Sequence, residues 1–444
     1  MAAPSRRLAL LRDHLASPDG LADPSPSPEP AAGVVRWLSS LFGGGDDAAG
    51  RTDGPAPHVL IGAYTDGEPV VMEDGTSIRF STGHARARPS APTPLPCCGS
   101  PPLHVRRPSP PPRPANHLCL AAAGGFVTRL DPSTGALTIV DAVTDNIGSN
   151  PAYTVHNPEK GVVYFTNEGA GGCVKAYSIG ADQTLSYINE LPTGGDAPCY
   201  LSLGPGGLIL CANYSSGELT VFSTDDDGAL LKANTVPLPG SADPIGSFDA
   251  SVYAGRQEAP HAHCVVPDSD PASGLAFACD LGSNEVVTLH VTAEGEVSYT
   301  HRCKLPAGTG PRHLALTPDG QRIVVGGELG NTLSVLEIDR EARALTLGAG
   351  CSLLPEGYEA PGTGTTVSHT DVSPSGKLVF VGNRVGVGIG GELPDDMVSG
   401  VGETGMEGAI SVIRLGEGGD VKLAAFEPTG GQVPREPPHS SQAG

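Results

Sequence analysis

The segment PRHLALTPDGQRIVVGGE, residues 311–328, contains the pattern that decides the fold. Two prolines seven residues apart frame a short apolar run, an Asp-Gly turn follows, and a second apolar run ends in a glutamate. Two short runs of strand-forming residues joined by such a turn predict a β-hairpin. The same frame recurs at PAYTVHNP (151–158), PCYLSLGP (198–205) and PHAHCVVP (260–267). VSHTDVSP (367–374) fits it with Val367 in place of the first proline.

Two further short apolar runs follow these hairpins. GELTVFST (217–224) and NTLSVLEI (331–338) are examples of the third run, and ALLKANTV (229–236) and ALTLGAGC (344–351) of the fourth. The unit repeats every 47 to 62 residues, which leaves room for four short strands. Tandem units of four antiparallel strands are typical of the blades of a β-propeller.

The repeat is incomplete at both ends. A partial unit precedes the others and consists of HVLIGAYT (58–65), GGFVTRLD (124–131) and GALTIVDA (135–142). A last unit starts at Gly431 and loses the pattern after a few residues. We therefore predict an all-β fold, a seven-bladed β-propeller with four-stranded antiparallel blades, of which the last is incomplete.

Two stretches lack the repeat. Residues 1–57 are poor in core material and are predicted to form a low-order tail, which leaves residues 58–444 as the propeller domain. Residues 84–116 hold eleven prolines and five arginines but no acidic residue, a composition that cannot pack a core. A cytoplasmic location is expected. An organellar location is the alternative, because the start, MAAPSRRLALLRDHLA, weakly matches an organellar transit peptide.

The composition narrows the possible partners. The chain has 27 Lys and Arg residues against 49 Asp and Glu, a net charge of −22, which disfavours binding to nucleic acids and anionic membranes. No apolar run is long enough to span a bilayer. The 10 cysteines are irregularly spaced and therefore predict reduced, buried thiols rather than disulfides or a zinc site. Protein partners cannot be predicted.

Propeller geometry turns the repeat into a candidate site. The innermost strand of each blade lines the central channel, so the start of that strand and the end of the next lie on one face near the axis. Aligned on the prolines, the starts are Ala152-Tyr153, Cys199-Tyr200, His261-Ala262, Arg312-His313, Ser368-His369 and Arg435-Glu436, and the ends are Glu168, Tyr214, Asp280, Glu328 and Arg384. Because Arg, Glu and Lys are seldom buried unless paired or functional, a polar ring here predicts a binding site.

Other motifs add little. The chain has no GxSxG, GxxxxGK[ST] or HExxH sequence. His261 and His263 share a strand face and could chelate a metal, but no third ligand is evident, so we expect no metal and no cofactor. The glycines at 386, 388 and 391 match a dinucleotide pattern without a following helix and are interpreted as a strand connection.

The segments PHAH (260–263), GPRHLALTPDG (310–320) and VGNR (381–384) resemble the seven-bladed β-propeller lactonase family. That family includes the bacterial-type 6-phosphogluconolactonases and the fungal carboxy-cis,cis-muconate cyclases. The resemblance runs from about residue 58 to 435, apart from the Pro/Arg-rich insert. It implies a metal-free site at the channel mouth that handles an anionic sugar lactone or a muconolactone.

The resemblance also implies roles for individual residues. It implies His261 or His263 and Glu328 as catalytic candidates and Arg312 and Arg384 as substrate-binding candidates. The polar ring adds four further substrate-binding candidates: His313, Glu168, Tyr200 and Asp280. A histidine would act as base near pH 7, and an arginine would hold an anion or polarise the lactone carbonyl. Two positions depart from the family: Gly327 replaces its usual asparagine and Tyr200 its histidine, and both changes reduce the number of polar groups in the ring.

Three functions are compatible with these features. The first is hydrolysis of an anionic sugar lactone, as by a 6-phosphogluconolactonase of the pentose phosphate pathway. The alternatives are a cycloisomerase acting on carboxymuconate-type lactones and a non-catalytic propeller that serves as an interaction module. Under the first, Arg312 is expected to be solvent-accessible and to meet Glu328 at the far end of the same hairpin.

Overall fold

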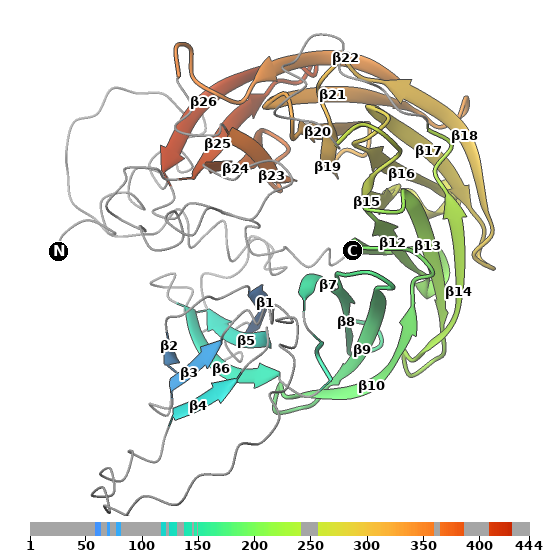
Figure 1. The fold of residues 1–444 in the computed structure, drawn as a ribbon. Coiled ribbons are helices and arrows are strands. Elements are labelled where there is room, and N and C mark those ends of the chain that lie inside the picture. The colour runs from blue at the N-terminus through green and yellow to red at the C-terminus, as the bar shows by residue number, and fades with distance from the viewer. Residues whose placement is uncertain are drawn as a thin grey trace, which may run out of the picture.

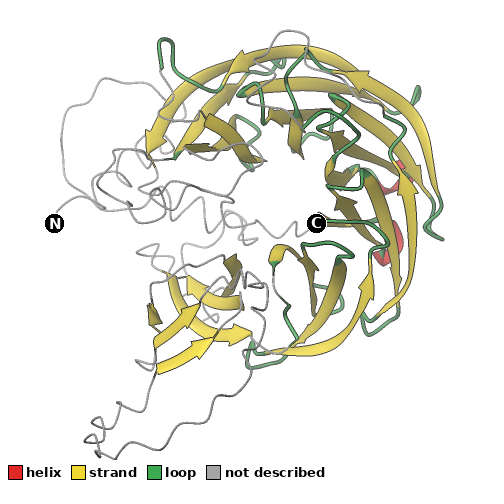
Figure 2. Cartoon of the chain, viewed as in Figure 1, coloured by secondary structure: helices red, strands yellow, loops and turns green. Residues whose placement is uncertain are grey.

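The computed structural model describes residues 146–148, 150–240, 256–358, 365–385 and 408–428, together with six strands between residues 58 and 143. Residues 1–57, the Pro/Arg-rich stretch 84–116 and the predicted last unit from Gly431 lie outside the described residues. The described part of the chain is almost entirely β-structure (Figure 2). It contains no helix long and apolar enough to cross a membrane.

Five four-stranded antiparallel sheets form the main body, each a separate blade whose strands pair in chain order. The first blade comprises β7 (Pro151–Asn157), β8 (Val162–Asn167), β9 (Cys173–Ile179) and β10 (Leu185–Pro192). The second comprises β11 (Pro198–Leu203), β12 (Ile209–Asn213), β13 (Glu218–Thr224) and β14 (Leu230–Pro237). The third comprises β15 (Ala262–Pro267), β16 (Leu275–Asp280), β17 (Glu285–Val291) and β18 (Val297–Lys304).

The fourth blade comprises β19 (Pro311–Leu316), β20 (Arg322–Gly327), β21 (Thr332–Asp339) and β22 (Ala344–Ser352). The fifth comprises β23 (Thr365–Val372), β24 (Leu378–Val385), β25 (Ala409–Leu415) and β26 (Val421–Pro428). Two single turns of 3₁₀ helix, Pro205–Gly207 and Pro271–Ser273, close the hairpins after β11 and β15. The proline-framed hairpins thus form the first two strands of each blade, as predicted.

Two smaller sheets precede these blades. β1 (His58–Ala63), β5 (Gly124–Leu130) and β6 (Leu137–Val143) form a three-stranded sheet, which confirms the predicted partial unit. β2 (Pro69–Val71), β3 (Ser77–Phe80) and β4 (His117–Leu120) form another, in which β3 and β4 are parallel. The sequence analysis did not predict this second sheet, because strands of three or four residues carry too little periodicity.

The sheets follow one another around a common centre (Figure 1). The strands nearest to this centre are β7, β11, β15, β19 and β23, and neighbouring members of this set contact one another from β7 through to β23. This arrangement confirms the predicted all-β propeller fold and brings the inner ends of the hairpins together.

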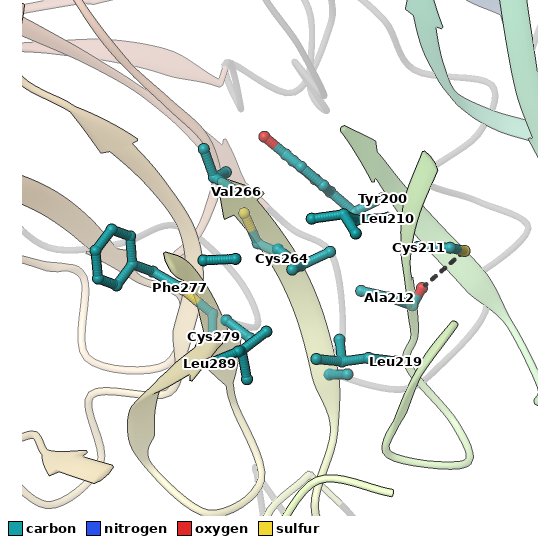
Figure 3. Packing of buried hydrophobic residues seen from close by; sticks show 14 of the residues in the cluster. Tyr200, Leu210, Cys211, Ala212, Leu219, Cys264, Val266, Phe277, Cys279 and Leu289 are labelled. Carbon is teal, nitrogen blue, oxygen red and sulfur yellow. Dashed lines mark hydrogen bonds between the residues drawn. The ribbon is translucent and has the colours of Figure 1, made fainter. Parts of the chain in front are cut away.

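Apolar side chains hold neighbouring blades against each other. Leu210 and Leu219 of the second blade lie in one buried cluster with Phe277 and Leu289 of the third (Figure 3). Burying each such side chain stabilises the fold by roughly 1.5–3 kcal/mol. The seven cysteines in the described residues are free, and five of them are buried, in agreement with the predicted reduced thiols.

Every inner strand carries a register irregularity near its start. On three of these strands the pairing skips a single residue: Cys199 on β11, His263 on β15 and Arg312 on β19. On β7 and β23 it skips two, Ala152-Tyr153 and Ser368-His369. A β-bulge redirects the side chain of the extra residue, and bulges are frequent beside active sites. The bulges therefore mark the ring of residues that meets at the centre of the propeller.

Candidate active site

The strand register corrects the sequence alignment of the third blade. Pro198 and Pro311 lie opposite Asn213 and Gly327, and in the third blade Ala262 lies opposite Asp280. β15 thus begins two residues after its proline. His263, rather than His261, is therefore the structural equivalent of Cys199 and Arg312.

The same register changes which residue of the third blade directly follows the second strand. Glu328 follows Gly327 directly, so its equivalent in the third blade is Leu281, one residue beyond Asp280. The predicted placement of Asp280 at this corner is wrong by one residue. The equivalents in the other blades are Glu168, Tyr214 and Arg384, as expected.

Glu328 is the centre of the charged cluster, with a side chain that is only 3% exposed. Its Oε1 atom lies 2.8 Å from Nη2 of Arg256 and 2.8 Å from Nη2 of Arg384. Its Oε2 atom lies 3.1 Å from Nε of Arg312, so Arg312 and Glu328 meet as predicted. Burial alone would raise the pKa of Glu328, but the three guanidinium groups outweigh it and hold the pKa well below its usual range. The carboxylate is therefore ionised.

Two of these arginines are fixed by the main chain of the fifth blade. Nη1 of Arg312 donates to the carbonyl oxygen of Ser368 (2.5 Å), and Nη2 of Arg384 donates to that of Val367 (2.7 Å). Arg312 is 7% exposed, so the expectation that it is solvent-accessible is wrong. The bulge turns its side chain against β23, which covers it.

His263 lies on the other side of Glu328. Its Nε2 atom is 3.9 Å from Oε2 of Glu328, and its Nδ1 atom is 3.6 Å from Sγ of Cys199. Its ring meets the rings of Tyr214 and His313 edge-on. Burial lowers the pKa of His263 well below its usual value and Arg312 lowers it further, against the partial compensation of Glu328. The imidazole is therefore neutral at pH 7.

His313 and His369 form a relay behind Arg312. Nη1 of Arg312 lies 3.1 Å from Nε2 of His313, and the two Nδ1 atoms of His313 and His369 are 2.9 Å apart. Because a guanidinium can only donate, His313 accepts at Nε2 and carries its proton on Nδ1, which donates to His369. Through these two contacts the rings of His313 and His369 position Arg312.

Aromatic side chains border the relay. Tyr200 packs on Tyr153 with ring centroids 4.2 Å apart and meets His313 edge-on at 5.1 Å. Both tyrosines are buried. Tyr200, a predicted member of the polar ring of residues, thus contacts His313.

His261 and Asp280 support a different part of the site. The His261 ring stacks on Tyr214 at 4.7 Å, with Nδ1 at 2.9 Å from the Tyr214 carbonyl oxygen and Nε2 at 3.1 Å from Oε1 of Glu258. Oδ1 of Asp280 accepts the backbone N–H groups of His261 and Ser283, both at 2.9 Å, and burial raises the pKa of Asp280. These contacts hold the turn that leads into β15.

Glu168 lines a separate polar cleft of about 400 Å³, together with Asn150, Asp196 and Ser215. The cleft lies where the loops after β8 and β12 meet. Within the described residues, no group of three or more His, Cys, Asp or Glu side chains could hold a metal ion.

Arg256 is the site residue that the sequence analysis missed. It lies in the connection between β14 and β15, outside the repeated motifs. The interval of 62 residues from Pro198 to Pro260 is longer than the intervals of 47 and 51 residues on either side of it, and long connections often carry functional residues. That length was the available signal.

The fold and site define a β-propeller protein with an arginine-rich centre suited to an anion. A family model described as "Lactonase, 7-bladed beta-propeller" matches residues 122–440. The chain therefore belongs to the seven-bladed β-propeller lactonase family, which confirms the predicted resemblance.

Three known proteins illustrate the similarity. An uncharacterized protein of Lactococcus lactis subsp. cremoris is 30% identical over 251 residues, which cover 56% of this chain and 67% of that protein. The 6-phosphogluconolactonase of Bacillus subtilis is 28% identical over 238 residues, or 53% of this chain and 64% of that protein. The solved structure of a periplasmic gluconolactonase from Pseudomonas aeruginosa has a TM-score of 0.57 at 23% identity, covering 70% of this chain and 81% of that one, and shows the shared fold.

Acidification is expected to destabilise the fold through His263 and Glu328. Their pKa values in the folded state lie well below the ordinary 6.5 and 4.5, so the unfolded chain binds more protons from about pH 6.5 downward. The free energy of unfolding therefore falls as the pH drops. Urea denaturation measures the free energy of unfolding at about pH 7.5 and at about pH 5.5. The decrease between the two pH values should be smaller for His263→Gln than for the wild type. Equal losses would contradict the assignment for His263.

Proposed function

We propose that this protein hydrolyses an anionic sugar lactone, and that its reaction is the opening of 6-phosphogluconolactone to 6-phosphogluconate in the pentose phosphate pathway. The observation that carries this proposal is the cluster of Arg256, Arg312 and Arg384 around the single carboxylate of Glu328. It places three guanidinium groups around one carboxylate within a protein of net charge −22. Such a local reversal of charge favours an anionic ligand.

Buried polar atoms without an aligned hydrogen bond also support a ligand at this place. Nε of Arg312 and Oε2 of Glu328 are shielded from solvent and make no aligned hydrogen bond, although they lie 3.1 Å apart. The buried Oγ atom of Ser368, at the neighbouring bulge, has no hydrogen-bond partner either. Buried polar groups are almost always satisfied, so a group of exceptions needs an explanation. A bound ligand or an ordered water can satisfy these atoms.

In this proposal His263 is the general base. Hydrogen bonds of about 2.8 Å can meet at one water, so a water can contact both His263 Nε2 and Glu328 Oε2, which are 3.9 Å apart. His263 removes a proton from this water as the oxygen attacks the lactone carbonyl carbon. The imidazolium returns that proton to the ring oxygen when the ester C–O bond breaks. The new carboxylic acid then releases its own proton to solvent.

Cys199 and Glu328 assist His263 in its role as general base. Burial raises the pKa of Cys199 well above its usual value, so the thiol stays protonated and its sulfur can accept the Nδ1 proton of His263. This leaves Nε2 unprotonated and facing Glu328. The ionised carboxylate stabilises the imidazolium as it forms, and Nε of Arg312 can donate to the developing oxyanion.

A panel of three lactones tests this function. Purified protein is mixed with 6-phosphogluconolactone, unphosphorylated gluconolactone and carboxymuconolactone, and product is measured above the spontaneous rate. We expect the highest kcat/KM with the phosphorylated lactone. Turnover of carboxymuconolactone in its place would support a cycloisomerase, and turnover of none of the three would contradict a lactonase.

Replacing Arg312 by alanine is expected to lower kcat/KM by about 100-fold, because a charged hydrogen bond made in a dry site is lost. Arg312→Lys should recover little, since an ammonium lacks the planar fork. Because Arg312 also bridges to Ser368, the alanine variant should lose about 1–2 kcal/mol of stability. Arg322→Ala, which breaks an ion pair on the outside of the same blade, is the control and should leave kcat/KM unchanged. An unchanged kcat/KM in Arg312→Ala would contradict the assignment.

A further inference from the structure

Arg256 differs from the two arginines that lie on blade strands. Its Nε donates to the hydroxyl oxygen of Tyr214 at 2.7 Å, and its Nη2 donates to Oε1 of Glu328 at 2.8 Å. Both partners are side chains, whereas Arg312 and Arg384 are also fixed to main-chain carbonyl oxygens. In the described part of the chain, no residue accepts a hydrogen bond from Nη1 of Arg256. A guanidinium has five N–H donors, so Arg256 retains donors for a ligand.

The two oxygens of Glu328 divide the site into two sides. Arg256 and Arg384 contact Oε1. Arg312 and His263 approach Oε2. The Oε2 side holds the base and the donor that act on the lactone carbonyl. The Oε1 side presents the guanidinium groups of Arg256 and Arg384.

The charge of the cluster fits a phosphate better than a carboxylate. Three guanidinium groups contact the one carboxylate of Glu328, and His263 adds no charge while it is neutral. A phosphate monoester carries about −1.5 to −2 charges at pH 7, and a carboxylate carries one. Arginine also binds phosphate oxygens bidentately.

Tyr214 and His261 hold Arg256 in place. The guanidinium carbon of Arg256 lies 5.6 Å from the centre of the Tyr214 ring, and the His261 ring stacks on Tyr214. Glu258, two residues beyond Arg256, lies 3.1 Å from His261. The connection that carries Arg256 is thus anchored to Tyr214, in the turn after β12 of the second blade.

Building on the proposed function, we propose that Arg256 is a specificity-determining residue that binds the phosphate group of the substrate, with Arg384 beside it. Arg312 and His263 act on the lactone ring. In this arrangement Arg256 selects phosphorylated over unphosphorylated sugar lactones.

The test compares Arg256→Gln with the wild type on 6-phosphogluconolactone and on unphosphorylated gluconolactone. We expect kcat/KM for the phosphorylated lactone to fall roughly 10- to 100-fold, mainly through KM, because a charged hydrogen bond is lost. For the unphosphorylated lactone the fall should be at least about fivefold smaller, since that substrate offers Arg256 no charge. Arg256→Lys should restore part of the loss by returning the charge without the fork. Arg322→Gln is the matched control and should behave as the wild type on both.

Equal losses on both lactones would overturn the proposal, because Arg256 would then act on a part that both substrates share. Calorimetric titration with 6-phosphogluconate and with gluconate separates this result from a failure of the proposed function. If the wild type hydrolyses neither lactone, the proposed function fails. If Arg256→Gln then binds 6-phosphogluconate more weakly than the wild type does, but binds gluconate equally well, phosphate recognition is still supported. Unchanged binding of 6-phosphogluconate overturns it. A thermal melt checks that the variant is folded.

Discussion

Replacing His263 by glutamine is expected to lower kcat for lactone hydrolysis by roughly 10³-fold, because positioned general bases contribute about 10²- to 10⁴-fold. The amide keeps a polar group beside Cys199 and Glu328 but cannot take a proton from water. The change removes no charge at pH 7, since burial and Arg312 hold the pKa of His263 well below its usual value. KM should therefore change little. The measurement is steady-state hydrolysis at about pH 7.5.

His261→Gln is the matched control for this variant, because it lies two residues away and makes the same chemical change. His261 contacts the Tyr214 carbonyl oxygen and Glu258 rather than the Glu328 carboxylate. Its replacement should reduce kcat less than about fivefold, with a larger effect on KM through the Arg256 connection. If His261→Gln lost kcat and His263→Gln kept it, the roles of the two histidines would be reversed.

The repeat allowed the blades to be predicted, but not the register of the third one. Prolines seven residues apart mark the inner strand wherever the strand starts at the first proline, as at Pro198 and Pro311. In the third blade the strand starts at Ala262, because the turn before it is held by Asp280 and His261 instead. Proline spacing carries no information about that turn, so the choice between His261 and His263 stayed open until the strands were paired.

The candidate site was predictable where it depends on one hairpin and not where it depends on neighbouring blades. Arg312 and Glu328 belong to adjacent strands, and their meeting follows from antiparallel pairing. The burial of Arg312 depends on Ser368 of the next blade. The contact of Arg256 with Glu328 joins residues 72 positions apart across two blades, and no local pattern records it.

Replacing Glu328 by glutamine is expected to cost about 3–5 kcal/mol of stability, because removing one partner of a buried ion cluster leaves the others uncompensated. Arg256, Arg312 and Arg384 would then face one another around a neutral amide. Urea denaturation at pH 7 measures the loss. The control is Glu337→Gln, which removes the partner of Arg322 from a side chain that is 47% exposed and should cost less than about 1 kcal/mol.

Inorganic phosphate provides the second measurement on Glu328→Gln. The variant keeps three guanidinium groups without their carboxylate, so it should bind an anion more tightly than the wild type does. Adding phosphate at constant ionic strength should therefore raise its Tm more than that of the wild type, because a ligand that binds only the folded state stabilises it. Hydrolysis should still fall, since His263 loses the carboxylate that stabilises its protonated form. A variant as stable as the wild type, with the same response to phosphate, would show that Glu328 does not hold the arginines together.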